Sequence, residues 1–119
     1  MNRIPDRPSY WVPNTNAFIS PAGQLIIQVE LSGLNSSGLQ ISVEGNQLKI
    51  SGHRRNPEFE SAQHSLVHEI NDGPFESVLD LPKEFDVARS SSAYTNGVLR
   101  IVVPRSDSPQ SPPQISLEN

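Results

Sequence analysis

The dipeptide Asn96-Gly97 constrains the fold of this chain more than any other short feature of its sequence. Both residue types tolerate the positive φ that a two-residue turn between antiparallel strands requires. In the next stretch, 98–103, apolar side chains at alternate positions fall on one face of an extended strand. Pro104 then ends the strand, because proline cannot donate a hydrogen bond to a neighbouring strand. The sequence therefore predicts a β-hairpin in an antiparallel protein.

Further strand signals precede this hairpin. Short apolar stretches, most of them alternating with polar residues, are separated by turn-rich segments. They occupy residues 17–19, 24–32, 39–43, 47–51 and 75–81. Residues 83–92 are expected to form a polar connector, and the polar segment 52–72 is too long for a plain connection. Without sustained helical periodicity, this order predicts an all-β meander or sandwich and not a βαβ protein.

The prolines divide the chain into three parts. They are concentrated at both ends, which predicts extended tails at residues 1–14 and 105–119 around a compact domain at residues 15–104. A chain of 119 residues suits one such domain.

Composition excludes several classes of function. The net charge is −4 and the pI is near 5.2, which argues against nucleic acid as the main partner. No apolar stretch approaches the length of a membrane span, and residues 1–10 lack the apolar core of a signal peptide. The absence of cysteine excludes disulfides and thiol nucleophiles. We therefore expect a cytoplasmic protein.

Catalytic and cofactor motifs are absent from the sequence. His64 and His68 have a helical metal-binding spacing, but they lack the glutamate of H-E-x-x-H. On a strand their rings would lie about 13 Å apart, too far to share an ion. Neither a G-x-S-x-G motif nor a phosphate-binding G-x-x-x-x-G-K-[ST] loop occurs. We expect no enzyme activity, no metal and no cofactor.

Several stretches resemble the motifs of the small heat-shock protein family, which is built on the α-crystallin domain. Ala93 and the residues Asn96-Gly97-Val98-Leu99 resemble its A-x-x-x-N-G-V-L signature. Residues 43–54 are similar to its V-x-G-N-x-L-x-I-x-G-x-R stretch, and residues 73–82 to its G-x-F-x-x-x-F-x-L-P stretch. The resemblance implies an immunoglobulin-like antiparallel β-sandwich of seven to eight strands with extended tails. It also implies a stress-response chaperone that binds unfolding proteins without ATP and prevents their aggregation.

The resemblance further implies where subunits and clients bind. It implies a homodimer and larger homo-oligomers, in which the loop equivalent to residues 52–72 carries a strand that pairs with the first strand of a partner subunit. The predicted dimer contacts are Phe18, Ile19, Leu66 and Val67. The predicted subunit or client groove is lined by Leu39, Ile41, Val43 and Ala93. It would receive the tail anchor formed by Ile115 and Leu117. Tyr10, Trp11 and Val12 are predicted to be client or assembly contacts.

The sequence departs from the family pattern in two places, and two other functions stay open. Ser77 and Val78 stand where the family usually carries an arginine, and Ser91 stands where it often carries an apolar residue. An alternative to the holdase is a monomeric co-chaperone or adaptor that binds one specific partner on the same sandwich. A carbohydrate-binding sandwich is a weaker alternative, because such modules present clustered aromatic rings and this chain has few.

Overall fold

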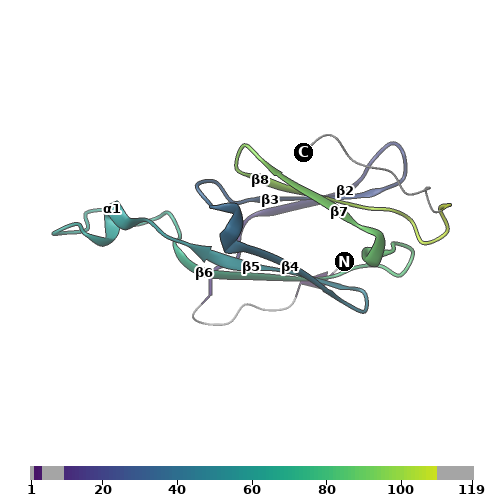
Figure 1. Cartoon of the computed structure of the whole chain (residues 1–119), viewed down its shortest axis with the longest axis horizontal. Coiled ribbons are helices and arrows are strands. Elements are labelled where there is room, and N and C mark those ends of the chain that lie inside the picture. Colours follow the sequence, from purple (N-terminus) through teal and green to yellow (C-terminus); the bar gives the residue numbers. More distant parts are fainter. Residues whose placement is uncertain (1, 4–9, 110–119) are drawn as a thin grey trace.

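Two four-stranded antiparallel sheets pack face to face in this protein (Figure 1). The computed structural model describes residues 2–3 and 10–109. One sheet has the order β1 (Asn2–Arg3), β6 (Gly73–Asp80), β5 (Gln47–Arg54) and β4 (Leu39–Glu44). The other has the order β2 (Thr15–Ile19), β3 (Leu25–Glu30), β8 (Val98–Val103) and β7 (Ser91–Thr95). The predicted antiparallel β-sandwich is therefore confirmed, with eight strands in the described part of the chain.

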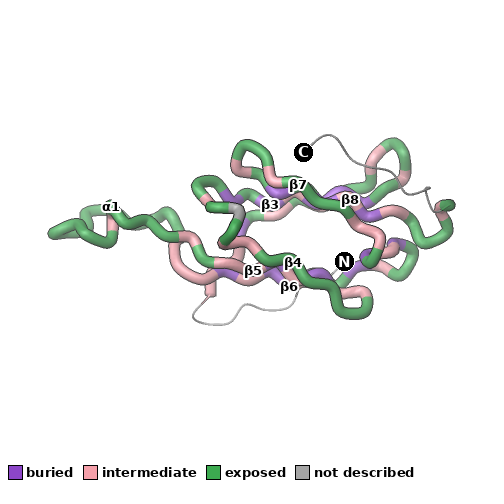
Figure 2. Tube along the Cα trace, in the orientation of Figure 1, coloured by how far each residue is buried: buried purple, intermediate pink, exposed green. Residues whose placement is uncertain are grey.

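The core lies between the sheets and follows the alternation read from the sequence. Each central strand turns every second side chain inward, and these inward side chains are almost fully buried. Figure 2 shows the buried residues along the strands. They include Leu25, Ile27 and Val29 from β3, Leu48 and Ile50 from β5, Phe75 and Leu79 from β6, and Leu99, Ile101 and Val103 from β8. Burying one such side chain contributes about 1.5–3 kcal/mol, so this shared layer is the main stabilising contact between the sheets.

Ile26 breaks the alternation for a local reason. Its side chain is 2% exposed although its position in β3 points to the outer face of the sheet. Its ladder partners are Phe18 on β2 and Val102 on β8, so three apolar side chains lie next to one another on that face. Ile26 therefore lies between two apolar neighbours on the outer face of the sheet.

The Asn-Gly hairpin forms as predicted between β7 and β8. Asn96 and Gly97 adopt φ of 53° and 80°. A side chain at Gly97 would bring its Cβ within 3.0 Å of the Cα of Ser32, and the Gly97 carbonyl accepts a hydrogen bond from the amide of Leu31 at 2.8 Å. The turn therefore closes the hairpin and also holds the end of β3.

Two connections differ from what the sequence predicted. The connector after β6 buries Phe85 and Val87, with a short 3-10 turn at Val87–Arg89, because it closes one end of the sandwich. The first residues of the long polar segment 52–72 belong to β5, because this strand continues to Arg54. Its remainder, residues 55–72, is named the arm here; it contains α1 (Pro57–Glu60) and projects away from the sandwich (Figure 1).

Ordered contacts continue past both limits predicted for the domain. Trp11 pairs with Phe75 of β6, and β1 pairs with Leu79 and Asp80 of the same strand. At the other end, Arg105 forms a bridge with Phe85. Short parts of both predicted tails therefore pack on the sandwich.

Candidate functional site

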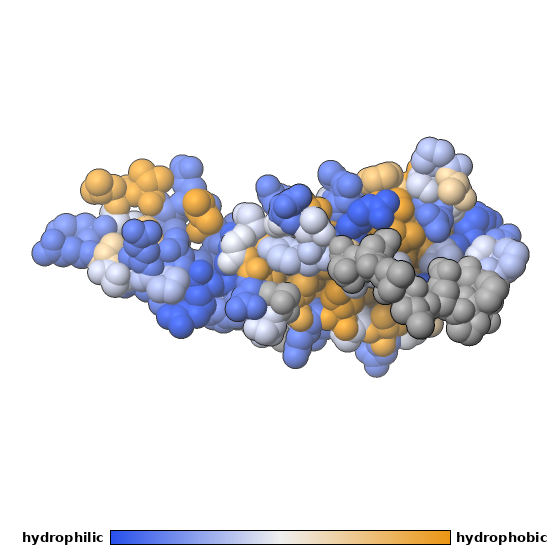
Figure 3. All heavy atoms as spheres, turned by 45° about the horizontal axis from the view of Figure 1, so that its top comes forward, coloured by the Kyte–Doolittle hydropathy of each residue, from blue (hydrophilic) through white to orange (hydrophobic). Residues whose placement is uncertain are grey.

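The two sheets end in edge strands on the same side of the sandwich. β4 and β7 both lie at the front in the view of Figure 1, each at the end of its sheet's strand order. An edge strand presents backbone N–H and C=O groups that have no neighbouring strand to pair with. Apolar side chains reach the surface on this side, as Figure 3 shows. The groove predicted from the resemblance would lie between these two strands, and it is called the β4–β7 groove here.

Two apolar side chains of β4 form one wall of this groove. Ile41 pairs with Ile50 and Val43 pairs with Leu48, so both share the inward face of their fully buried partners. Ile41 nevertheless remains 36% exposed and Val43 43% exposed. Leu39 lies on the same face and packs partly against the core. Inward-facing side chains that stay open to solvent make this edge able to bind an apolar segment.

The opposite wall differs from the prediction at one residue. Ala93 pairs with Arg100, which places it on the exposed outer face of β7. The inward positions are Ser92, opposite Ile101, and Tyr94, opposite Leu99. The structure therefore does not bring Ala93 together with the three β4 residues.

The sequence contained the signal that identifies Ser92. In the signature A-x-x-x-N-G-V-L the alanine stands four residues before the asparagine, which is position 92 and not 93. A two-residue turn at Asn96-Gly97 gives the same register, because it pairs Thr95 with Val98 and Ser92 with Ile101. Ser91 pairs with Val102 on the outer face, so the polar residue in the groove is Ser92.

Tyr94 on the inward face of β7 makes two hydrogen bonds through its hydroxyl group. The hydroxyl donates to the carbonyl of Leu31 and accepts a hydrogen bond from the amide of Leu34 at 3.3 Å. These contacts tie β7 to the segment that follows β3. The wall formed by β7 is therefore anchored, although β7 is an edge strand.

The arm carries the most exposed apolar side chains in the described residues. Leu66 is 95% exposed, and Val67 and Ile70 are also largely exposed. They belong to the apolar patch on the projecting part of the molecule in Figure 3. In the single chain residues 61–72 contain no strand, and no ladder within the described ranges joins the arm to β2.

Short-range contacts shape the part of the arm next to β5. The Asn56 side chain accepts a hydrogen bond from the Phe59 amide and caps α1. Arg55 forms an ion pair with Glu60 at 2.6 Å. The Phe59 ring lies 4.4 Å from the ring of His68, centroid to centroid. These contacts keep one side of the arm folded on itself.

The predicted dimer contacts on β2 lie on a strand that is the edge of its sheet in the described part of the chain. β2 stands at the opposite end of its sheet from β7, and Phe18 and Ile19 are both exposed. Phe18 shares a face with Ile26, whereas Ile19 pairs with Leu25 and faces the other way. The two predicted contacts therefore lie on opposite faces of one edge strand.

Trp11 docks on its own domain. Its amide donates to the carbonyl of Pro74 at 3.2 Å, and its carbonyl accepts from the amide of Glu76 at 3.1 Å. Its ring packs on Phe75 at 5.3 Å between centroids. Its neighbours Tyr10 and Val12 are half-buried. The three residues predicted to contact clients or other subunits thus lie in a segment that is bound along β6.

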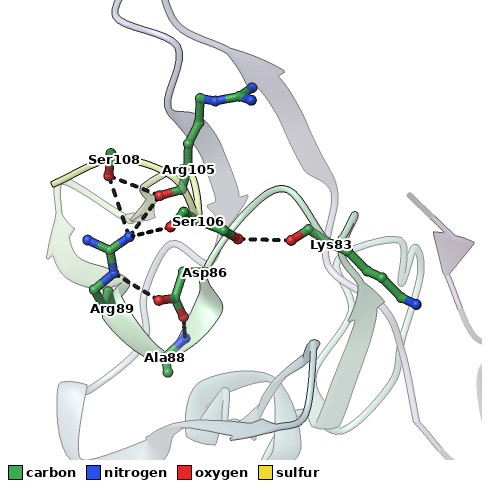
Figure 4. A network of polar contacts seen from close by, with 7 residues as sticks. All are labelled: Lys83, Asp86, Ala88, Arg89, Arg105, Ser106 and Ser108. Atoms are coloured by element: carbon green, nitrogen blue, oxygen red, sulfur yellow. Dashed lines mark hydrogen bonds and ion pairs between the residues drawn. The ribbon is translucent and has the colours of Figure 1, made fainter. Parts of the chain in front are cut away.

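A polar network fixes the start of the C-terminal segment (Figure 4). Arg89 Nε bonds to Asp86 Oδ2 at 2.8 Å, and Arg89 Nη2 donates to the carbonyl of Arg105 at 2.8 Å. The Ser106 hydroxyl donates to the carbonyl of Lys83 at 2.9 Å. These bonds set the direction in which the chain leaves β8. The predicted anchor residues Ile115 and Leu117 lie outside the described residues.

The histidines and acidic residues form no metal-binding cluster within residues 2–3 and 10–109. His68 Nε2 lies 3.5 Å from Asp72 Oδ2, and His64 is exposed on the arm. A search of the described residues also finds no helix that is long and apolar enough to cross a membrane.

Solved structures share this fold. A small heat-shock protein from Xylella fastidiosa has a TM-score of 0.73 and 24% sequence identity, covering 92% of this chain and 98% of that one. Heat shock protein 16.0 from Schizosaccharomyces pombe has a TM-score of 0.70 and 22% identity, covering 91% of this chain and 99% of that one. At these identities the likeness supports the fold.

Sequence comparison gives the family. Small heat shock protein C1 of Rickettsia felis is 34% identical over 104 residues, which cover 87% of this chain and 59% of that protein. Across the Rickettsia relatives the chain spans 50% to 62% of their length. The family model described as Hsp20/alpha crystallin family matches residues 20–118. The chain therefore belongs to the Hsp20/alpha crystallin family of small heat shock proteins.

Proposed function

We propose that this protein is an ATP-independent holdase, which binds unfolding proteins and keeps them from aggregating. The observation that carries the proposal is the partial exposure of Ile41 and Val43 on the inward face of an edge strand. Such a wall offers two things to an unfolded chain: apolar surface for its side chains and free backbone groups along β4. Unfolding proteins expose the matching features.

The mechanism we propose is addition of an extended segment along the groove. In an extended segment, side chains two residues apart point the same way, so both can enter one apolar groove. Ile41 and Val43 have the same spacing on β4 and would contact them. Binding of this kind depends on apolar burial and backbone hydrogen bonds, and needs no nucleotide.

We also propose that the protein works as a homodimer and as larger oligomers. The arm offers Leu66 and Val67, and the free edge of β2 offers Phe18 and Ile19. Pairing the arm of one subunit with β2 of another would cover apolar side chains on both. This would act in the cytoplasm, with Tyr10, Trp11 and Val12 adding client or assembly contacts.

The C-terminal anchor is the remaining part of the proposal. Ile115 and Leu117 are two residues apart and follow a proline-rich tether, which favours an extended conformation. Docked in the β4–β7 groove of a neighbouring subunit, they would occupy the site that clients use. Release of the tail would then open the groove.

Light scattering of a heat-aggregating model client tests the proposed activity. The client is heated without nucleotide, alone and with increasing amounts of this protein. We expect scattering to fall as the amount of protein rises, and added ATP to make no difference. Unchanged scattering at a several-fold molar excess would refute the holdase and favour an adaptor that binds one partner.

A further inference from the structure

Arg54, the last residue of β5, lies where three separate segments of the chain meet. Its Nε and Nη2 both donate to the carbonyl of Asn71, with the Nε contact at 3.0 Å. Its Nη1 donates to the carbonyl of Ser32 at 3.2 Å. Its guanidinium carbon lies 4.4 Å from the centre of the Trp11 ring. One side chain therefore joins the segment after β3, the returning end of the arm, and the N-terminal segment.

Trp11 also reaches the base of the arm directly. Its indole Nε1 donates to the carbonyl of Gly73 at 3.2 Å. Gly73 is the first residue after the arm and the ladder partner of Arg54. Arg54 and Gly73 therefore both contact docked Trp11 and both form part of the base of the arm.

A guanidinium is required to make these contacts together. Its planar fork can donate along several fixed directions while its face stacks on an aromatic ring. A lysine at this position would keep the positive charge but lose both the fork and the stacked plane. The contacts thus depend on the shape of the Arg54 side chain as well as on its charge.

We propose that Arg54 is a positioning residue that couples the N-terminal segment to the arm. Docked Trp11 holds the guanidinium over the carbonyl of Asn71 and so orders the base of the arm. Release of Trp11 frees the guanidinium and loosens the arm. The coupling lies within one chain; only its effect on subunit pairing rests on the proposed function of the arm.

The coupling has a functional consequence because linkage between two sites is reciprocal. A partner subunit that orders the arm favours docked Trp11. A client that displaces Trp11 from β6 loosens the arm and weakens the dimer by the same factor. Client capture by the N-terminal segment and exchange of subunits are therefore linked through Arg54.

The experiment uses the full chain and two independent readouts. Trp11 is the only tryptophan, so its fluorescence reports its own docking. A glutamate-specific protease cuts the arm at Glu58, Glu60 and Glu69, and mass spectrometry assigns the cuts. The variants are Arg54→Lys and Trp11→Leu, with Arg55→Lys as the matched control, because Arg55 pairs with Glu60 inside the arm. Cleavage is measured at a dilution at which sedimentation gives a monomer.

We expect Arg54→Lys to shift the Trp11 emission to the red and to speed cleavage of the arm about fivefold or more. Trp11→Leu, although it lies outside the arm, should speed the same cleavage. In the double variant, the increase in cleavage rate should be smaller than the product of the increases in the two single variants. Arg55→Lys should leave the Trp11 emission unchanged. If Trp11→Leu unfolds the domain, Trp11→Met replaces it, since it keeps apolar packing on Phe75 and removes both the ring that stacks on Arg54 and the bond to Gly73.

Two results would overturn the proposal. One is wild-type cleavage of the arm in the Trp11 variant, even when Arg54→Lys speeds that cleavage. The other is an Arg54→Lys protein with wild-type fluorescence and cleavage. Sedimentation at higher concentration is a separate measurement: a protein that never dimerises refutes the proposed role of the arm and leaves the coupling result standing.

Discussion

Among single residues, Gly52 occupies a position where there is no room for a side chain. A Cβ built at this position would lie 2.1 Å from the carbonyl oxygen of Gly38 and 2.7 Å from Cζ of Phe75. The first atom belongs to the backbone and cannot move aside without shifting the end of β4. The glycine at position 52 is thus explained by the close approach of the Gly38 carbonyl, at the end of the 3-10 turn before β4, and of the Phe75 ring.

Replacing Gly52 by alanine should therefore destabilise the domain by about 3 kcal/mol through overpacking. Gly45→Ala is the control: Gly45 has φ of 60° with no atom within 4 Å of a Cβ, so only backbone strain of about 1–2 kcal/mol applies. Urea unfolding of both variants gives the comparison. A Gly52→Ala protein as stable as the Gly45→Ala protein would contradict the crowding seen around Gly52.

The Glu60 carboxyl provides a pH prediction at the same scale. The hydrogen bond and the positive charge of Arg55 lower the pKa of this carboxyl. A lowered pKa in the folded state gives stability that is present above the ordinary carboxyl pKa and is lost as pH falls through the folded value. Arg55→Gln should raise the pKa of Glu60, as measured by NMR titration. An unchanged Glu60 titration in that variant would show that the ion pair does not form in solution.

At the level of strands and connections, the positions of the strands could be predicted from the sequence better than the packing of the segments that connect and flank them. Alternation located the central strands, and the Asn-Gly turn located the last hairpin. The inward position of Ser92 was also readable, because a two-residue turn fixes the register. Phe85 and Val87 could not be assigned to the core, since isolated apolar residues in a polar connector carry no periodic signal. The docking of Trp11 depends on Arg54 and Phe75, which are distant in sequence.

Deleting the arm is expected to prevent dimer formation without unfolding the sandwich. Arg54 and Gly73 are ladder partners, so the arm between them can be replaced by a two-residue Asn-Gly turn. We expect a folded monomer, because the arm contributes none of the buried core side chains. Sedimentation gives the mass, and circular dichroism checks that the sandwich is intact. Dimers that persist without the arm would place subunit pairing on another surface.

Across the whole molecule, the proposed function depends on which strand edges stay open. The N-terminal segment covers β6 through β1 and Trp11, whereas β4, β7 and β2 remain edges in the described chain. Strand order decides this, and no single stretch of sequence encodes strand order. The predicted groove was therefore placed through resemblance to a family, and the register of β7 moves its second wall from Ala93 to Ser92 and Tyr94.

The C-terminal tail carries the prediction for assembly. Burying Ile115 and Leu117 contributes about 1.5–3 kcal/mol each, while ordering each tail residue costs about 1–2 kcal/mol. One docked tail is therefore marginal, and several acting together hold an assembly through effective concentration. Ile115→Ala with Leu117→Ala should convert larger assemblies to dimers without unfolding the domain. A molar mass equal to that of the wild type would remove the tail from the proposed assembly.

Client capture by matched variants of β4 tests whether the β4–β7 groove binds unfolding proteins. The groove variant is Ile41→Ser with Val43→Ser; the control, Gln40→Ser with Glu44→Ser, changes the outer face of the same strand. Both are compared with wild type by light scattering of a heated client without nucleotide, after thermal unfolding shows that the domains are folded. We predict that the groove variant loses most of its suppression of aggregation while the control keeps it. Equal suppression by the groove variant and the wild type would contradict the claim.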